Sequence, residues 1–314
     1  MSSSPGLQRF FKDDSPTLPQ APRGISCPKG PETGEWEVFY DRVVTRVLRG
    51  TPSPGRHRLF DPEEAFDFWH ALVSGSGEGV DRVRDGFRRL IEGRIPDNPA
   101  DLLTVPLVPA PDVSVVRALA QEFPHFARAG VIEALEESLV LARAGDGNLF
   151  FPPILLLGDP GVGKTRFFRR MGEMFAVLSR FELDCAMASA GWILSGSSST
   201  WAGSKAGAVF SLLATDRGGL GNPLIFLDEL DKAREMRDST PLQTLYTLLE
   251  PEGARQFRDE FFPIRLDASR ILWMAAGNEL SPIPAPIQSR FRIFVVPAPS
   301  PDEKRSLAIG IWRE

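Results

Sequence analysis

The sequence is poor in the two residue types that build disulfides and zinc sites. It contains two cysteines, Cys27 and Cys185, and three histidines in 314 residues. Cysteines so few and so far apart resemble no disulfide or metal-binding framework. No apolar run approaches the roughly 20 residues of a membrane-spanning helix, and the first residues lack the basic and apolar regions of a secretory signal. We therefore expect a soluble, cytoplasmic protein that does not contact membranes.

The sequence also lacks an excess of positive charge. Its formal net charge is −5 at pH 7 and its pI is about 5.5. Surfaces that bind nucleic acid or anionic membranes are usually basic, so this balance argues against both partners. A chain of 314 residues is long enough for one large domain or two modest ones.

The most informative segment that is present is residues 158–165, GDPGVGKT, directly after the apolar run 154–157. Glycines let such a loop turn so that its amide groups point inward around phosphate oxygens. The Lys164 side chain would bring a positive charge to the β- and γ-phosphates, and the Thr165 hydroxyl would ligate Mg²⁺. The pattern predicts a site for ATP and Mg²⁺ whose loop residues are Gly158, Asp159, Pro160, Gly161, Val162, Gly163, Lys164 and Thr165.

An amphipathic helix is predicted directly after this loop. Apolar residues recur there at the three-and-four spacing of one helical face, while the charged residues fall elsewhere. Strand, glycine loop and helix in this order are the context that a nucleotide site needs. The alternative is a glycine-rich turn in some other α/β protein. The predicted apolar face comprises Phe167, Phe168, Met171, Met174, Phe175 and Leu178.

Composition divides the chain into four parts. Residues 1–33 are rich in Ser, Pro, Gly and charge and are predicted to be disordered, and residues 34–95 are predicted to form a small helical N-terminal module. A Pro-rich linker is expected over residues 96–112, followed by an α/β domain over residues 113–314. The helical stripes are Trp36, Phe39, Val43, Val44, Val47 and Leu48; Phe66, Trp69 and Leu72; and Val83, Phe87, Leu90 and Ile91, with a flexible joint at Ser74–Gly79 before the last.

Strands alternate with helices in the predicted α/β domain. This alternation indicates a five-stranded parallel sheet with helices on both faces. Ligands of such sheets bind beyond the carboxyl ends of the strands, and the remaining polar signals occur at those ends. The predicted strands are residues 154–157, 181–186, 224–227, 271–275 and 293–296.

Two acids, Asp228 and Glu229, follow the third of these strands. Burying unpaired carboxylates is costly, whereas carboxylates that face a Mg²⁺-nucleotide have a chemical role. Asp228 would hold the metal, mostly through water, and Glu229 would polarise the water that attacks the γ-phosphate. The alternative is that both acids cap the next helix together with Asp231 and Lys232.

Two more polar residues lie between the fourth and the fifth predicted strand. Asn278 comes directly after the fourth strand, where an amide can hydrogen-bond both the γ-phosphate and the attacking water. A lone Asn at that place is more often an ordinary turn residue. Arg290 comes shortly before the fifth strand, and a single arginine is usually a surface charge.

In combination these segments resemble the AAA+ ATPases and, within them, the ATPase module of Lon proteases, over roughly residues 120–310. The resemblance implies that Asn278 is the residue termed sensor 1 and that Arg290 is an arginine finger, with Arg292 as a substitute. A finger acts across a subunit boundary, so a homo-oligomeric ring, typically a hexamer, is implied. Besides the loop at 158–165, the ordered matches are LDELDK at 227–232, LLEPE at 248–252, FRD at 257–259, AGN at 276–278 and IPAP at 283–286.

Trp201 bears on the substrate. It lies in TWAGSKAG at 200–207, which looks like the Lon pore loop, where an aromatic residue among small ones grips a polypeptide in the central channel. Lon typically has Tyr at this place, and a flat ring with flexible neighbours holds many side chains through apolar contact. The resemblance thus implies ATP hydrolysis coupled to remodelling or translocation of a protein substrate. The alternative is that Trp201 is a core residue.

Departures from the Lon pattern leave other functions open. Asp159 stands where Pro is usual and adds negative charge near the phosphates, and the chain ends at Glu314, where the small helical lid with its sensor 2 arginine should begin. No Ser–Lys protease domain follows, so no peptidase activity is expected. The missing lid and Asp159 favour a nucleotide-gated assembly scaffold with little hydrolysis, which the Asp228–Glu229 pair opposes. An AAA+ ATPase that acts on nucleic acid is the other alternative. A GTPase is not expected, because the Asn-Lys-x-Asp signature that recognises guanine does not occur.

Overall fold

The structure is a computed structural model that describes residues 47, 50–92, 98–187, 192–201, 203–215, 219–233 and 241–304. The predicted disordered segment 1–33 and most of the first predicted helical stripe lie outside these residues. In the part of the chain that is described, no helix is both long enough and apolar enough to cross a membrane.

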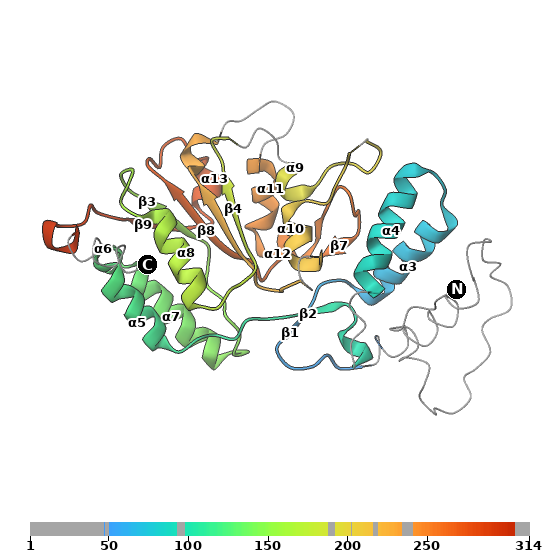
Figure 1. The fold of residues 1–314 in the computed structure, drawn as a ribbon, viewed down its shortest axis with the longest axis horizontal. Helices are drawn as coiled ribbons and strands as arrows, with labels where there is room; N and C mark the ends of the chain where they lie inside the picture. Colours follow the sequence, from blue (N-terminus) through green and yellow to red (C-terminus); the bar gives the residue numbers. More distant parts are fainter. Residues whose placement is uncertain are drawn as a thin grey trace.

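A five-stranded parallel sheet forms the centre of the molecule (Figure 1). The order across the sheet is β4-β5-β8-β3-β9, and every neighbouring pair is parallel. This confirms the predicted α/β fold and its five strands, with ends shifted by one or two residues. The strands are β3 (Ile154–Leu157), β4 (Arg180–Asp184), β5 (Leu224–Asp228), β8 (Leu272–Gly277) and β9 (Arg292–Val295).

Alternating side chains of the central strands enter two separate cores. Ile154 and Leu156 of β3 pack on the face covered by α5 (Val113–Glu122), α7 (Val131–Ala144) and α8 (Lys164–Met174), while Leu155 and Leu157 pack on the opposite face. Strands of a parallel sheet are buried on both faces and therefore read as continuous apolar runs. This explains why the sequence pattern located them.

The helix α8 follows the predicted pattern except at its end. Phe167, Phe168, Met171 and Phe175 are buried, whereas Leu178 is 85 % exposed, so its assignment to the apolar face was wrong. The helix ends at Met174, and Ala176 takes a positive φ of 56°. The chain therefore leaves the helical axis before Leu178 can reach the core.

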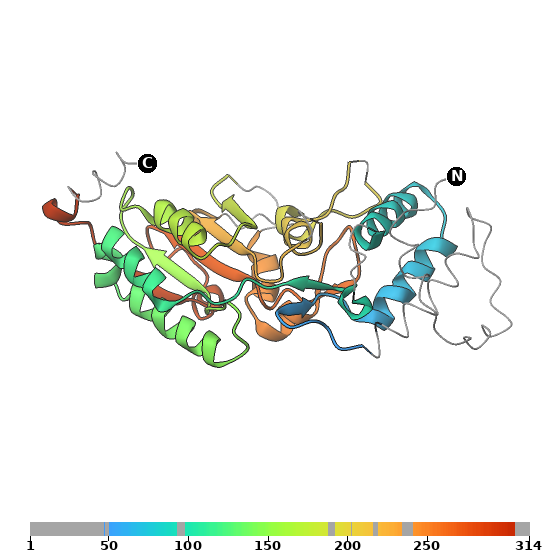
Figure 2. The same ribbon diagram turned by 60° about the horizontal axis from the view of Figure 1, so that its bottom comes forward.

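The N-terminal part contains a helical hairpin of α3 (Pro62–Ser74) and α4 (Glu78–Glu92), which lies at the end of the molecule opposite α5 and α7 (Figure 2). The Asp61 carboxylate accepts from the Glu64 N–H at the start of α3, and Pro62 occupies its first turn. Phe66, Trp69 and Phe87 are buried in the same apolar cluster as Ile225 of the sheet. The hairpin therefore packs on the α/β core.

The described part of the predicted linker, residues 98–112, contains regular secondary structure. β1 (Arg56–Arg58) pairs antiparallel with β2 (Thr104–Pro106), and η1 (Pro99–Asp101) precedes that strand. Within it Val105 is fully buried. A linker between two domains need not be buried, whereas this segment contributes a residue to the core. The domain boundaries stay a prediction.

Shorter elements connect the sheet with these helices. They are α6 (Pro124–Arg128), α9 (Trp192–Ser195), α10 (Ala208–Phe210), η2 (Ser211–Thr215), η4 (Leu230–Lys232), α11 (Pro241–Leu248), α12 (Pro251–Arg255), β6 (Phe257–Arg258), β7 (Arg265–Leu266) and α13 (Ala285–Gln288). The hairpin β6–β7 is antiparallel and stands apart from the central sheet.

Candidate nucleotide-binding site

Three central strands end at one edge of the sheet, and the loops that follow them surround a pocket of about 300 Å³. Leu157 of β3 is in register with Gly277 of β8, so the loop after β3 begins beside Asn278. This edge is where parallel sheets bind their ligands. The residues that line the pocket are Pro160, Gly161, Gly163, Lys164, Thr165, Arg166, Asp228, Glu229, Gly277 and Asn278.

Glycines shape the loop between β3 and α8 for two different reasons. Gly161 and Gly163 have φ values of 82° and 95°, a left-handed conformation that other residues rarely adopt. Gly158 is needed for space, because a Cβ there would lie 2.6 Å from the Val296 carbonyl oxygen. Gly163 is also the N-cap of α8, where no side chain caps the first amide groups. These amides and the helix dipole are suited to bind an anion.

Lys164 is the centre of the hydrogen bonds in this loop. Its Nζ donates to the carbonyl oxygens of Gly158 and Asp159 over 2.7 and 3.2 Å, and to Asn278 Oδ1 over 3.2 Å. The predicted loop lysine and the predicted sensor residue are therefore in direct contact. Burial lowers the pKa of Lys164, and nearby carboxylates, Asp228 first among them, oppose this effect.

Thr165 and Asp228 form the part of the site that fits a magnesium ion. The Thr165 hydroxyl donates to Asp228 Oδ2 over 2.9 Å, and Asp228 Oδ1 accepts from the Glu229 N–H over 2.9 Å. Hydroxyl and carboxylate oxygens are the hard ligands that Mg²⁺ prefers, and Mg²⁺ in nucleotide sites completes its shell with phosphates and water. The donor set thus fits Mg²⁺ bound together with a nucleotide.

Glu229 lies at the mouth of the pocket with its side chain exposed. Its φ of 52° is left-handed, which is uncommon for a residue other than glycine and is often found at functional sites. It occupies the N-cap position of η4 but makes no side-chain cap hydrogen bond. The alternative that this acid caps the next helix therefore finds no support.

The sequence reasoning assigned no role in the site to Asp231, which lies directly beneath it. Its side chain is fully buried, with Lys232 Nζ 3.1 Å from Oδ2. A Cβ on Gly277 would lie 3.1 Å from Asp231 Oδ1, so the acid packs against the end of β8. Its negative charge also counteracts the lowering of the Lys164 pKa. The signal for this residue is the second acid in LDELDK at 227–232, which the sequence pattern alone does not distinguish from a helix cap.

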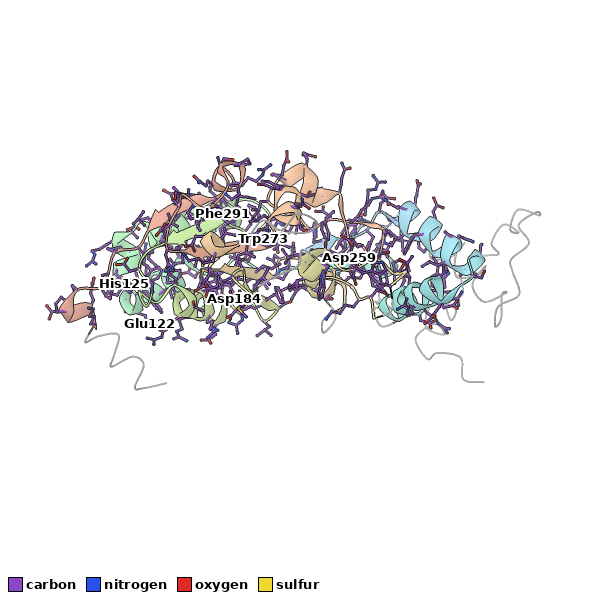
Figure 3. All side chains as sticks on the ribbon, turned by 90° about the horizontal axis from the view of Figure 1, so that it is seen from above. Glu122, His125, Asp184, Asp259, Trp273 and Phe291 are labelled. Carbon is purple, nitrogen blue, oxygen red and sulfur yellow. The ribbon has the colours of Figure 1, made fainter. Side chains whose placement is uncertain are left out.

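His125 of α6 was also missed. It is fully buried, and its Nε2 donates to the Val162 carbonyl oxygen over 2.8 Å. Burial lowers its pKa, so the neutral ring that makes this bond is favoured. Figure 3 shows His125 close to Glu122, at the end of the molecule where α5 and α6 lie. The phosphate loop is therefore fastened to a helix that precedes β3.

Five predicted site residues lie outside the lining of this pocket, namely the loop residues Gly158, Asp159 and Val162 together with Arg290 and Trp201. Asp159 is exposed and does not line it, but its negative charge, like that of Asp228, opposes the lowering of the Lys164 pKa. Arg290 is partly buried; it donates to the Pro286 carbonyl oxygen over 2.6 Å and lies 3.4 Å from Glu250 Oε2. Trp201 is 66 % exposed, which removes the alternative of a core tryptophan.

Asp259, in the predicted FRD segment, is buried at the base of the loop that carries Trp201. Its carboxylate accepts from the N–H groups of Gly207, Phe261 and Phe262 over 2.8, 2.9 and 3.2 Å. Burial raises the pKa of Asp259 to about 6. Figure 3 shows Asp259 far from His125, on the side of the helical hairpin.

Replacing Asp259 with asparagine is expected to lower the free energy of unfolding at pH 7 by about 1–3 kcal/mol, because an amide NH₂ would face a backbone N–H. The raised pKa of about 6 means that the native state binds the proton of Asp259 more tightly than the unfolded chain does. The contribution of Asp259 to the free energy of unfolding is therefore largest at low pH. It falls as the pH rises from about 4 to about 6. Urea denaturation across this range checks both effects. Asp85→Asn on exposed α4 is the control, and a wild-type-minus-variant difference that is independent of pH would contradict the assignment.

The comparisons with known proteins agree with this geometry. Residues 154–297 match the family model described as "ATPase family associated with various cellular activities (AAA)". The peroxisomal Lon protease homolog 2 of Pongo abelii is 30 % identical over 200 residues, which are 63 % of this chain and 22 % of that protein. The Lon protease of Halothermothrix orenii is 31 % identical over 193 residues, 59 % of this chain and 23 % of the relative.

A solved structure shares the fold at low sequence identity. The extended conformation of the S. cerevisiae Hsp104:casein complex aligns with a TM-score of 0.52 and 15 % identity, covering 89 % of this chain and 59 % of that chain. The chain spans less than a quarter of the length of the Lon relatives above, so their likeness concerns the ATPase part. Residues 154–297 form a domain of the AAA ATPase family, and the chain resembles the ATPase module of Lon proteases.

Proposed function

We propose that this protein hydrolyses ATP with Mg²⁺ and uses the energy to remodel or translocate a protein substrate, as part of a Lon-like ring. The observation that carries the proposal is the convergence of Lys164, Thr165, Asp228 and Asn278 on one pocket at the carboxyl edge of the sheet. A glycine-rich turn of an unrelated α/β protein would not require these contacts.

Each residue of the pocket has a role that follows from its chemistry. The loop amides and the Lys164 ammonium bind the phosphates, and Thr165 and Asp228 hold the metal, which when bound neutralises phosphate charge. Glu229 is exposed at the mouth of the pocket, so its carboxylate is free to orient and polarise a water molecule. Asn278 accepts from Lys164 through Oδ1, and its NH₂ group remains a donor to the γ-phosphate.

Arg290 is proposed to complete the site of a neighbouring subunit. It lies outside the lining of its own pocket, so its action on the nucleotide would need a second copy of the chain. Its guanidinium is held by Glu250 and lies 6.0 Å from the centre of the Tyr246 ring. A preoriented arginine loses little side-chain freedom when it engages the transferring phosphoryl group.

The proposed protein substrate depends on Trp201. An exposed tryptophan on a loop is favourable for apolar contact with a polypeptide, and the net charge of −5 disfavours nucleic acid. The scaffold alternative depends partly on the negative charge of Asp159, whose exposed side chain does not line the pocket, and the Asp228–Glu229 pair that does line it opposes this alternative. Hydrolysis with a protein substrate is therefore the better supported function.

The first test is the rate of ATP hydrolysis per subunit over a wide range of protein concentration. A rate that climbs steeply and then saturates is expected, because each site is completed by a neighbour. The variant Arg290→Ala should lower the saturated rate by about 10³-fold or more. Arg292→Ala tests the substitute finger and should leave the saturated rate nearly unchanged; a large loss in Arg292→Ala alone would move the role to Arg292.

Mixing two inactive variants tests the location of the finger. Glu229→Gln subunits have an intact Arg290, and Arg290→Ala subunits have an intact pocket, so mixed assemblies should recover activity if the finger acts between subunits. A rate that does not depend on concentration, together with no recovery on mixing, would remove the ring from the proposal. Bound ATP without any turnover would instead select the scaffold.

A further inference from the structure

The loop that carries Trp201, residues 197–201 and 203–205, lies beside α4, which precedes it by more than a hundred residues (Figure 1). Arg82 of α4 donates from Nη2 to the Ser199 carbonyl oxygen over 2.7 Å and from Nη1 to the Trp201 carbonyl oxygen over 3.1 Å. One guanidinium thus binds two backbone carbonyls of this loop, which we term the Trp201 loop. Hydrogen bonds from a charged donor are about twice as strong as neutral ones.

The backbones of helix and loop are also in close contact. Gly79 lies nearly one turn before Arg82, and a Cβ on Gly79 would lie 2.9 Å from the Ser199 carbonyl oxygen. Because that neighbour is backbone, a side chain at this position would force the helix and the loop apart. The approach therefore depends on glycine.

The stem of the Trp201 loop is fixed from the other side. The Ser197 N–H donates to the Lys205 carbonyl oxygen over 3.1 Å, and Lys205 Nζ lies 5.8 Å from the centre of the Trp192 ring. Gly207, just after the loop, is bound by the buried Asp259. Fixed at its stem and bound by Arg82 near its tip, the loop presents an indole that is 66 % exposed at Trp201.

The hairpin provides a rigid base for this contact. Val83, next to Arg82 in the sequence, is buried, and Phe87 one turn further is fully buried against Phe60 at a ring distance of 6.2 Å. A residue on a helix that is packed on the core is held more precisely than one on a free loop. The guanidinium therefore fixes the loop relative to the sheet that carries the nucleotide pocket.

We propose that Arg82 is a positioning residue for the Trp201 loop, through which the α3–α4 hairpin holds the exposed indole in place to engage a polypeptide. The inference rests on the proposed function of Trp201. It assigns to the N-terminal helices a part in substrate engagement, although none of their described residues lines the ATP pocket.

The experiment compares Arg82→Ala, Arg82→Lys and Gly79→Ala in the full chain. Arg84→Ala is the matched control, since the Arg84 guanidinium pairs with Asp81 and with the Leu72 carbonyl oxygen inside the hairpin. Hydrogen–deuterium exchange followed by mass spectrometry reports on the Trp201 loop, and hydrolysis of ATP with and without casein reports on substrate engagement. Trp201→Ala is measured beside them.

In Arg82→Ala the amides of the Trp201 loop are expected to exchange about tenfold faster or more, with β3 and β5 unchanged. Stimulation by casein should fall by at least about fivefold while the basal rate stays near wild type, since no pocket residue is altered. Arg82→Lys should be intermediate, because an ammonium lacks the fork that spans two carbonyls. Gly79→Ala should resemble Arg82→Ala, and Arg84→Ala should resemble wild type.

The outcomes separate this inference from the function on which it rests. If Trp201→Ala abolishes stimulation but Arg82→Ala matches Arg84→Ala in both exchange and stimulation, Arg82 does not position the loop. If Trp201→Ala leaves stimulation intact, the proposed contact with polypeptide fails, and with it the role of Arg82 in engagement. Faster exchange confined to the loop in both Arg82→Ala and Gly79→Ala, with reduced stimulation, supports the inference.

Discussion

Replacing Glu229 with glutamine should lower ATP turnover by about 10²- to 10⁴-fold, because an amide cannot take up the proton of the attacking water. ATP affinity should change little. The phosphates are bound by the loop after β3 and by Lys164, whereas Glu229 lies exposed at the mouth of the pocket. Single-turnover hydrolysis measures the first quantity, and titration with a non-hydrolysed ATP analogue measures the second.

Glu279→Gln is a matched control for this prediction. Glu279 is exposed directly after Asn278, near the same edge of the sheet, but it does not line the pocket. Its loss should leave turnover close to wild type. If Glu229→Gln hydrolysed ATP at the wild-type rate, the assignment of Glu229 would be wrong, and another group would have to orient the water.

Lys164→Ala is expected to weaken ATP binding severely. The ammonium is buried and preoriented by Gly158, Asp159 and Asn278, so in the nucleotide complex its charge would act in a partly dehydrated site. Since hydrogen bonds to charged groups contribute about 1.5–3 kcal/mol each, losing two of them raises the dissociation constant by about 10²-fold or more. Isothermal titration calorimetry with ATP and Mg²⁺ checks this value.

The same substitution leaves carbonyl oxygens without their donor, so stability must be measured beside affinity. Thermal denaturation without nucleotide separates loss of fold from loss of binding. Lys304→Ala is the control, because this lysine is exposed and does not line the pocket. Retained ATP affinity in folded Lys164→Ala would count against the phosphate loop itself.

The sequence was sufficient to predict those features that depend on neighbours along the chain. The strands β3, β5 and β8 are short apolar runs, Asp228 ends β5 and Asn278 follows β8, and the glycine loop joins β3 to an amphipathic helix. The contact between Lys164 and Asn278 could be anticipated as well, because parallel strands bring their carboxyl ends to one edge.

Features that depend on contacts distant in sequence could not be predicted. The bonds of His125 to Val162 and of Arg82 to Ser199 join residues 37 and 117 positions apart. Neither histidine nor arginine carries a local pattern that names its partner. Leu178 failed for a different reason, since periodicity alone does not reveal that α8 ends at Met174. Asp231 was visible, but its burial beneath Gly277 depends on the position of β8.

The continuity of one apolar cluster from the N-terminal hairpin to the sheet has a consequence for the autonomy of the ATPase part. Phe210 packs against Phe60 at a ring distance of 6.1 Å and against Phe262 at 4.3 Å, and Phe60 precedes every strand of the central sheet. A shortened chain that began after the hairpin would leave these aromatic faces in water. The N-terminal helices are therefore part of one continuous core with the sheet, and we expect a chain cut after α4 to fold poorly by itself.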